Sequence, residues 1–230
     1  MQGMADSLFW CLNHPASTAR LADWDDKMDI EGIKCPIDEG HARGGKRLMD
    51  LSVVLPAGAA KDFVWTWGSA CLAQDHVLKL FQANAFTGYQ VKPVKARFKS
   101  ERAQGPPTLW EIVVTGWAGM APAESGIKLV ERCDGCGYLV YSGCTDPEKL
   151  IDVSQWDGSD FFMVWPLPKF IFVTNRVAQI IRDNRLSGVV LKRPRELDLS
   201  GGSVGISPGR LSRYMPEDRA RELGAALGID

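Results

Sequence analysis

The segment that most constrains the fold of this chain is Cys133-Asp134-Gly135-Cys136-Gly137, a CxxCG sequence. Two cysteines with this spacing present both thiolates to one metal ion from a single tight turn, and structural zinc takes four such ligands. The glycine that follows lets the backbone fold back without a clash from a side chain. A zinc site at this turn therefore needs two further ligands from another part of the chain.

The second half of such a site is expected at Cys35, which Pro36 follows as in many knuckles. The place of a second cysteine is taken by Asp38, and the place of the glycine by Glu39. The first knuckle has therefore decayed or has been rebuilt around another ligand.

Three ligands are candidates for the vacant position: the carboxylate of Asp38, the imidazole of His41 or the thiolate of Cys144. We favour the set Cys35, His41, Cys133 and Cys136. Four protein ligands leave no open position for water or substrate, so a zinc ion here is expected to be structural. The alternative is that the metal is lost and the cysteines are only packed.

The size of the chain allows one large domain or two small ones, because it has 230 residues. We expect a single compact unit over residues 1–230. Two sub-lobes are possible within it, a β-rich part with the knuckle at 1–150 and an α/β part at 151–230.

The composition is that of a soluble globular protein, with 45% hydrophobic and 24% charged residues. No apolar run approaches the ~20 residues of a membrane span, and no secretory signal is visible at the N-terminus. Six cysteines without an export signal favour the reducing cytoplasm, with metal binding or burial rather than disulfides.

Hydrophobic periodicity predicts an α+β fold with mixed or antiparallel sheets. The CxxCG segment is expected to join two strands as a zinc-knuckle hairpin within residues 127–143. Other strands are predicted at 51–56, 62–67, 89–99 and 109–117, with Pro93 placing 89–99 toward a sheet edge, and a helix is predicted at 73–84, with Val77, Leu80 and Phe81 on its apolar face.

The C-terminal third predicts a strand-helix-strand module. It follows the apolar run 161–165 and a WPLP turn, and a helix at 215–228 ends the chain. Its expected parts are a strand at Phe170–Val173, Thr174 as helix N-cap, Val177, Ile180 and Ile181 as the buried helix face, Gly188 as helix stop, and a strand at 189–194.

With these segments in this order, the chain resembles the double-CXXCG motif family, which is known chiefly from myxobacteria. The resemblance covers residues 35–230, and its most specific part is the block FFMVWPLPKFIFVTNRVAQIIRDNRLSGVVL. It implies a non-enzymatic immunity protein that binds and neutralises a cognate bacterial toxin. Cys133, Cys136 and Gly137 match the family's second motif, whereas Asp38 and Glu39 depart from its first.

A protein toxin as partner agrees with a cluster of acids near the N-terminus, which suits a partner with a basic face. The candidate partner-binding residues are Asp23, Asp25, Asp26, Asp29 and Glu31. The alternative is that this acidic run is a solvent-exposed loop without a binding role.

The sequence also offers features of two other classes of function. A zinc-ribbon nucleic-acid-binding protein would use the basic stretch Lys92, Lys95, Arg97, Lys99 and Arg102, but a net charge of −1 disfavours nucleic-acid binding. A cysteine- or metal-dependent enzyme is the weaker alternative, because Cys71 and His76 are spaced to lie on different faces of a helix.

Overall fold

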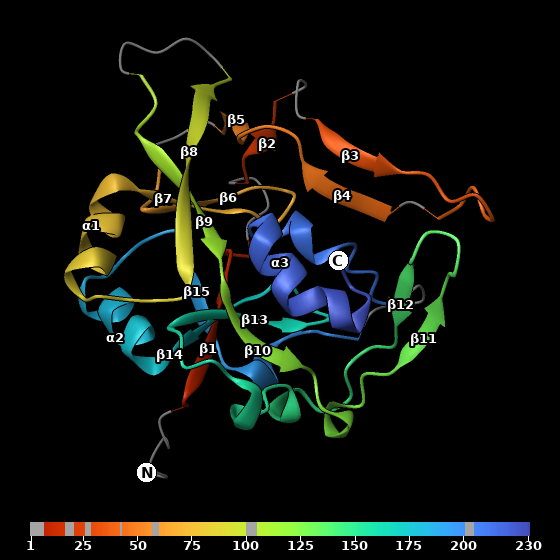
Figure 1. The fold of residues 1–230 in the computed structure, drawn as a ribbon. Helices are drawn as coiled ribbons and strands as arrows, with labels where there is room; N and C mark the ends of the chain where they lie inside the picture. Colours follow the sequence, from red (N-terminus) through yellow and green to blue (C-terminus); the bar gives the residue numbers. More distant parts are fainter. Residues whose placement is uncertain are drawn as a thin grey trace.

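The computed structural model describes residues 7–16, 21–25, 29–41, 43–56, 60–99, 105–200 and 205–230. These residues form a mixed α+β fold made mostly of sheets with few helices, which confirms the predicted fold class (Figure 1). In the described residues, no helix is long and apolar enough to cross a membrane.

The larger sheet has six strands, in the order β2 (Asp23–Trp24), β5 (Ser52–Leu55), β8 (Tyr89–Phe98), β9 (Leu109–Val114), β7 (Cys71–Gln74) and β6 (Phe63–Trp65). Only β5 and β8 run parallel. Pro93 lies where β8 has β9 as its single neighbour, because pairing with β5 begins at Lys95. The missing N–H of Pro93 is therefore tolerated at a local edge, as the sequence predicted.

The second sheet has five strands, in the order β10 (Gly116–Met120), β13 (Phe161–Trp165), β14 (Ile171–Thr174), β1 (Phe9–Asn13) and β15 (Val190–Lys192). The prediction of one strand over 109–117 was wrong, because the chain passes from the first sheet to the second at Thr115. There the N–H groups of Thr115 and Gly116 both donate to the carbonyl oxygen of Gly88, which interrupts the ladder.

In the described parts of the chain, three α-helices accompany the sheets: α1 (Asp75–Ala83), α2 (Asn175–Asp183) and α3 (Glu217–Gly224). The predicted helix at 73–84 is confirmed as α1, which buries Val77, Leu78 and Phe81. Single turns of 3₁₀-helix lie at Ala123–Ser125, Pro147–Lys149, Val153–Gln155, Pro194–Glu196, Leu211–Arg213 and Ala225–Leu227.

Helix α2 begins where the sequence predicted, but the residues predicted to cap its start and to end it do not play those roles. Thr174 occupies the N-cap position, yet its hydroxyl donates to buried Asp160 and makes no capping bond. The helix ends at Asp183, and Arg185 takes the left-handed conformation expected of Gly188. Gly188 is needed elsewhere, since an added Cβ would lie 2.1 Å from the carbonyl oxygen of Phe63.

The main hydrophobic core lies between the two sheets and runs from Phe9 to Ile229. Strand β13 is buried along its whole length. Its Phe161 packs against Phe81 and Tyr89, with ring centroids 5.2 Å and 4.9 Å apart. The middle and last thirds of the chain thus pack together in this core.

Two small antiparallel sheets lie to one side of this core, β3 (Ile30–Ile33) with β4 (Arg43–Arg47) and β11 (Leu129–Arg132) with β12 (Leu139–Tyr141). The segments that connect the strands of each pair approach one another at the right of Figure 1. One connection includes residues 34–41, and residues 133–138 form the other. They bring the two knuckle sequences together.

Candidate metal centre

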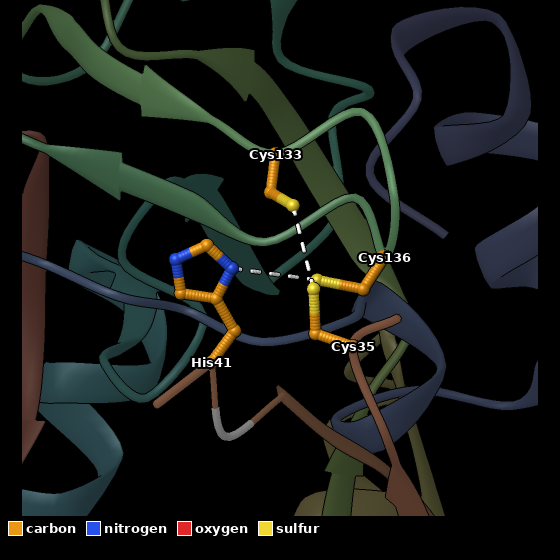
Figure 2. Close-up of side chains that lie close together, drawn as sticks. All are labelled: Cys35, His41, Cys133 and Cys136. Atoms are coloured by element: carbon orange, nitrogen blue, oxygen red, sulfur yellow. Dashed lines mark hydrogen bonds between the residues drawn. The ribbon is translucent and has the colours of Figure 1, made fainter. Parts of the chain in front are cut away.

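Cys35, His41, Cys133 and Cys136 form one cluster, which is the ligand set favoured from the sequence. One ligand atom from each residue lies within 4.8 Å of the others. The Sγ atoms of Cys35 and Cys133 are 3.6 Å apart, and Nδ1 of His41 is 3.9 Å from Sγ of Cys136. Figure 2 shows the four side chains converging on one point from the two connections.

These separations fit a tetrahedral metal site. Zinc–sulfur bonds of about 2.3 Å in a tetrahedron place neighbouring sulfur atoms about 3.8 Å apart, and the shorter zinc–nitrogen bond brings nitrogen slightly closer. Cys133 is buried, and the other three residues are half-buried. The donor set of three thiols and one imidazole suits zinc better than magnesium or calcium, which prefer oxygen.

The first connection is folded by its own hydrogen bonds. Sγ of Cys35 accepts the backbone N–H groups of Ile37 at 3.4 Å and Asp38 at 3.3 Å. The carboxylate of Asp38 accepts the N–H of Gly40 at 2.8 Å, and the N–H of His41 donates to the Asp38 carbonyl. Asp38 therefore shapes the turn that carries His41 into the cluster and does not itself belong to the four.

The second connection folds around its glycine. The N–H of Cys133 donates to the carbonyl oxygen of Tyr138 at 2.9 Å, and the N–H of Gly137 donates to the carbonyl oxygen of Cys133 at 2.8 Å. Gly137 has a φ of 69°, a left-handed conformation that glycine adopts without a Cβ penalty. The ring of Tyr138 stacks on His41 with centroids 4.6 Å apart. The imidazole is thus held against the turn that supplies two of the thiols.

The second nitrogen of His41 faces carboxylates. Nε2 lies 3.2 Å from Glu131 and 3.5 Å from Asp38. A carboxylate on the outer nitrogen fixes the orientation of a ligating histidine and raises its basicity. Sequence reasoning missed Glu131, although it precedes Cys133 by two residues on a strand, where alternate residues share a face.

The thiol of Cys35 has a lowered pKa. Burial by itself raises its pKa, but the hydrogen bonds from the N–H groups of Asp38 and Ile37 outweigh that effect and lower the pKa to about 6. The neighbouring Cys35 thiol also raises the pKa of His41. Burial raises the pKa of Cys136. The cluster therefore holds at least one thiol that is a thiolate near neutral pH, the form that binds metal.

The remaining cysteines lie elsewhere. The thiol of Cys144 donates to the carbonyl oxygen of Ser125 at 3.2 Å, so this candidate ligand is outside the cluster. Cys11 and Cys71 are fully buried, and burial raises both pKa values, that of Cys11 to about 12. Nε2 of His76 pairs with Asp62 at 3.0 Å.

The candidate partner-binding acids lie in different environments. Asp23 and Asp29 are exposed. Asp25 pairs with Arg97 at 3.3 Å. Glu31 is half-buried, with its carboxylate over Gly45. Asp26 lies outside the described residues, as does Arg102 of the basic stretch.

No known family model matches the chain, and no curated protein matches it either. The interpretation of the cluster therefore depends on its geometry and on the chemistry of its side chains.

Proposed function

We propose that Cys35, His41, Cys133 and Cys136 hold one zinc ion with a structural role. The observation that carries this proposal is the approach of all four ligand atoms to within 4.8 Å of one another. With four protein ligands the coordination sphere is full, so the ion has no position for substrate. In this interpretation the β11–β12 pair and its CxxCG turn form a zinc-knuckle hairpin.

The zinc ion would join two parts of the chain that are distant in sequence. Cys35 and Cys133 are 98 residues apart. The connections that carry them also expose large apolar side chains: Ile37 is 70% exposed and Val130, beside the second connection, is 67% exposed. A metal ion that fixes both connections would present these side chains on a preorganised surface, which lowers the entropic cost of binding a partner.

We further propose that the protein is a non-enzymatic immunity protein that acts in the cytoplasm by binding a cognate bacterial toxin. The resemblance to the double-CXXCG motif family supports this role, with β14, α2 and β15 as its strand-helix-strand module. The exposed apolar residues near the zinc cluster, rather than the dispersed acids, are the better anchors for a protein partner.

The zinc proposal is tested by native mass spectrometry of the purified protein with and without a chelator. One zinc per chain is expected, lost on chelation and absent from His41→Ala. Asp38→Asn and Cys144→Ser are expected to keep the ion. Loss of zinc from either control variant with retention in His41→Ala would assign the fourth ligand differently.

The immunity proposal is tested by expressing candidate toxins, taken from the genes that neighbour this one, with and without the protein. Rescue of growth and a stoichiometric complex are expected. The double variant Ile37→Asp/Val130→Asp is expected to lose rescue while retaining zinc. Val153→Asp is the control, because Val153 is also exposed, at 54%, but lies on the 3₁₀ turn Val153–Gln155 and not on either connection. Failure of the native protein to rescue refutes the role without affecting the zinc result.

A further inference from the structure

A cleft of about 810 Å³ opens beside the six-stranded sheet, away from the metal centre. We call it the tryptophan cleft, and its lining includes Trp24, Trp67, Gly68, Arg97, Lys99 and Arg213. A narrower recess of about 70 Å³ shares Trp24, Gly68 and Arg213 with it and is also lined by Lys169. The volume falls within the range of small-molecule binding sites.

The lining carries an excess of positive charge. Arg97 is paired with Asp25, and Asp23 is an acid on the lining. Within the part of the chain that the structure describes, Lys99, Lys169 and Arg213 form no ion pair with a carboxylate. Lys99 lines the cleft, Lys169 lines the adjoining recess, and Arg213 lines both. Cations that have no carboxylate partner and lie around adjoining hollows favour the binding of an anion.

Arg213 is held in place at the meeting point of the cleft and the recess. Its guanidinium lies so close to the backbone of β4 that a Cβ added to Gly44 would be 1.9 Å from Nη1. The packing around Lys169 and the positive charge of Arg213 lower the pKa of Lys169. An anion between the two side chains would relieve this repulsion.

The same cleft offers an aromatic surface. The structure describes all eight tryptophans, and Trp67 is the only one with a mostly exposed side chain, at 59%. Trp24 is half-buried against Gly68, where an added Cβ would meet the indole ring at 2.4 Å. An exposed indole beside cations is a stacking platform for a nucleobase that carries phosphate.

We propose that the tryptophan cleft binds a nucleoside phosphate, with the base stacked on Trp67 and the phosphate held by Arg213 with Lys99 or Lys169. A small ligand is favoured over a nucleic-acid strand because the net charge of the chain is −1. This site is independent of the zinc ion and of the immunity role.

The test is calorimetric titration of the full chain with the monophosphates of adenosine, guanosine, cytidine and uridine, alongside adenosine and inorganic phosphate. At least one nucleotide is expected to bind with a Kd of about 1 mM or tighter. Adenosine and phosphate alone are expected to bind at least about tenfold more weakly than the best nucleotide, because each makes only one of the two contacts. Equal binding of phosphate alone would reduce the site to an anion site and overturn the proposal.

Variants of exposed side chains locate the ligand. Trp67→Ala is expected to weaken binding about tenfold, whereas Trp67→Phe retains most of it. Lys99→Gln is expected to weaken binding in low salt, and the control Lys128→Gln, an exposed lysine outside the cleft, leaves it unchanged. The proposal is overturned if no nucleotide binds, or if Trp67→Ala and Lys99→Gln both bind like the native protein. Binding of a single-stranded RNA oligonucleotide far more tightly than any nucleotide would also overturn it, in favour of a polymer site.

Discussion

The substitution Cys133→Ser tests whether the metal centre cross-links the fold. It removes one of the two thiols of the CxxCG turn and breaks the connection to Cys35, 98 residues away in the chain. In the loop-entropy treatment, a cross-link over about a hundred residues destabilises the unfolded chain by about 4.7 kcal/mol. This value is an upper limit here, because an unfolded chain that still binds zinc through some ligands reduces it.

The expected change in melting temperature follows from the size of the protein. For a chain of this length, 1 kcal/mol corresponds to roughly 2–4 °C, so loss of the cross-link lowers the Tm by about 10–20 °C. The matched control is Cys144→Ser, which alters only a thiol that donates to Ser125. A serine hydroxyl can make the same bond, and the cost is about 1 kcal/mol or less.

Differential scanning calorimetry with and without a chelator separates the cross-link from local packing. Chelation is expected to lower the Tm of the native protein and of Cys144→Ser, but not that of Cys133→Ser, which has already lost the ion. A native protein whose Tm is unchanged by the chelator would refute the reasoning, as would a further large drop when the chelator is added to Cys133→Ser.

Three further predictions concern the surroundings of the site and the fold. Glu131→Ala should weaken zinc binding about 10- to 100-fold in a chelator competition, because it removes the carboxylate on the outer nitrogen of the histidine ligand. In zinc-free protein, Cys35 should be alkylated faster as the pH rises through about 6, whereas buried Cys11, with a pKa of about 12, should stay unreactive. Because the pKa of Cys35 is lowered in the fold, its ionisation stabilises the zinc-free fold most above its ordinary pKa of 9.0, and this contribution is lost as the pH falls through about 6. Glu111→Gln should lower the free energy of unfolding in urea by up to about 3 kcal/mol, because it leaves the half-buried Arg47 without its carboxylate partner. Glu217→Gln, at an exposed ion pair, should lower it by at most about 1 kcal/mol.

The sequence favoured Cys35, His41, Cys133 and Cys136, the four residues that the structure brings together, but it left Asp38 and Cys144 open as alternatives to His41. Asp38 and His41 both follow Cys35 within one turn, and spacing alone does not show which side chain points inward. The decision depends on hydrogen bonds: the carboxylate of Asp38 closes the turn on Gly40, and this places His41 toward Cys136. The acid that supports His41 comes from another strand.

Local signals predicted helices better than the arrangement of strands. The apolar spacing around Val77 and Phe81 located α1, because helix contacts are local. The break at Thr115 was not visible in the sequence, since it depends on the carbonyl of Gly88 in another segment. The same applies to Thr174, whose hydroxyl binds Asp160 instead of capping its helix. Long-range partners decide such features, and one sequence does not reveal them.

Strand β1 lies between β14 and β15, so its two neighbours come from the opposite end of the chain. During synthesis, residues 9–13 leave the ribosome early but cannot complete their hydrogen bonds until residue 192 has emerged. This apolar strand therefore stays unpaired on both edges through most of translation, and an unpaired apolar strand favours aggregation or chaperone binding. Folding should be slow and largely post-translational, since these pairings span most of the chain.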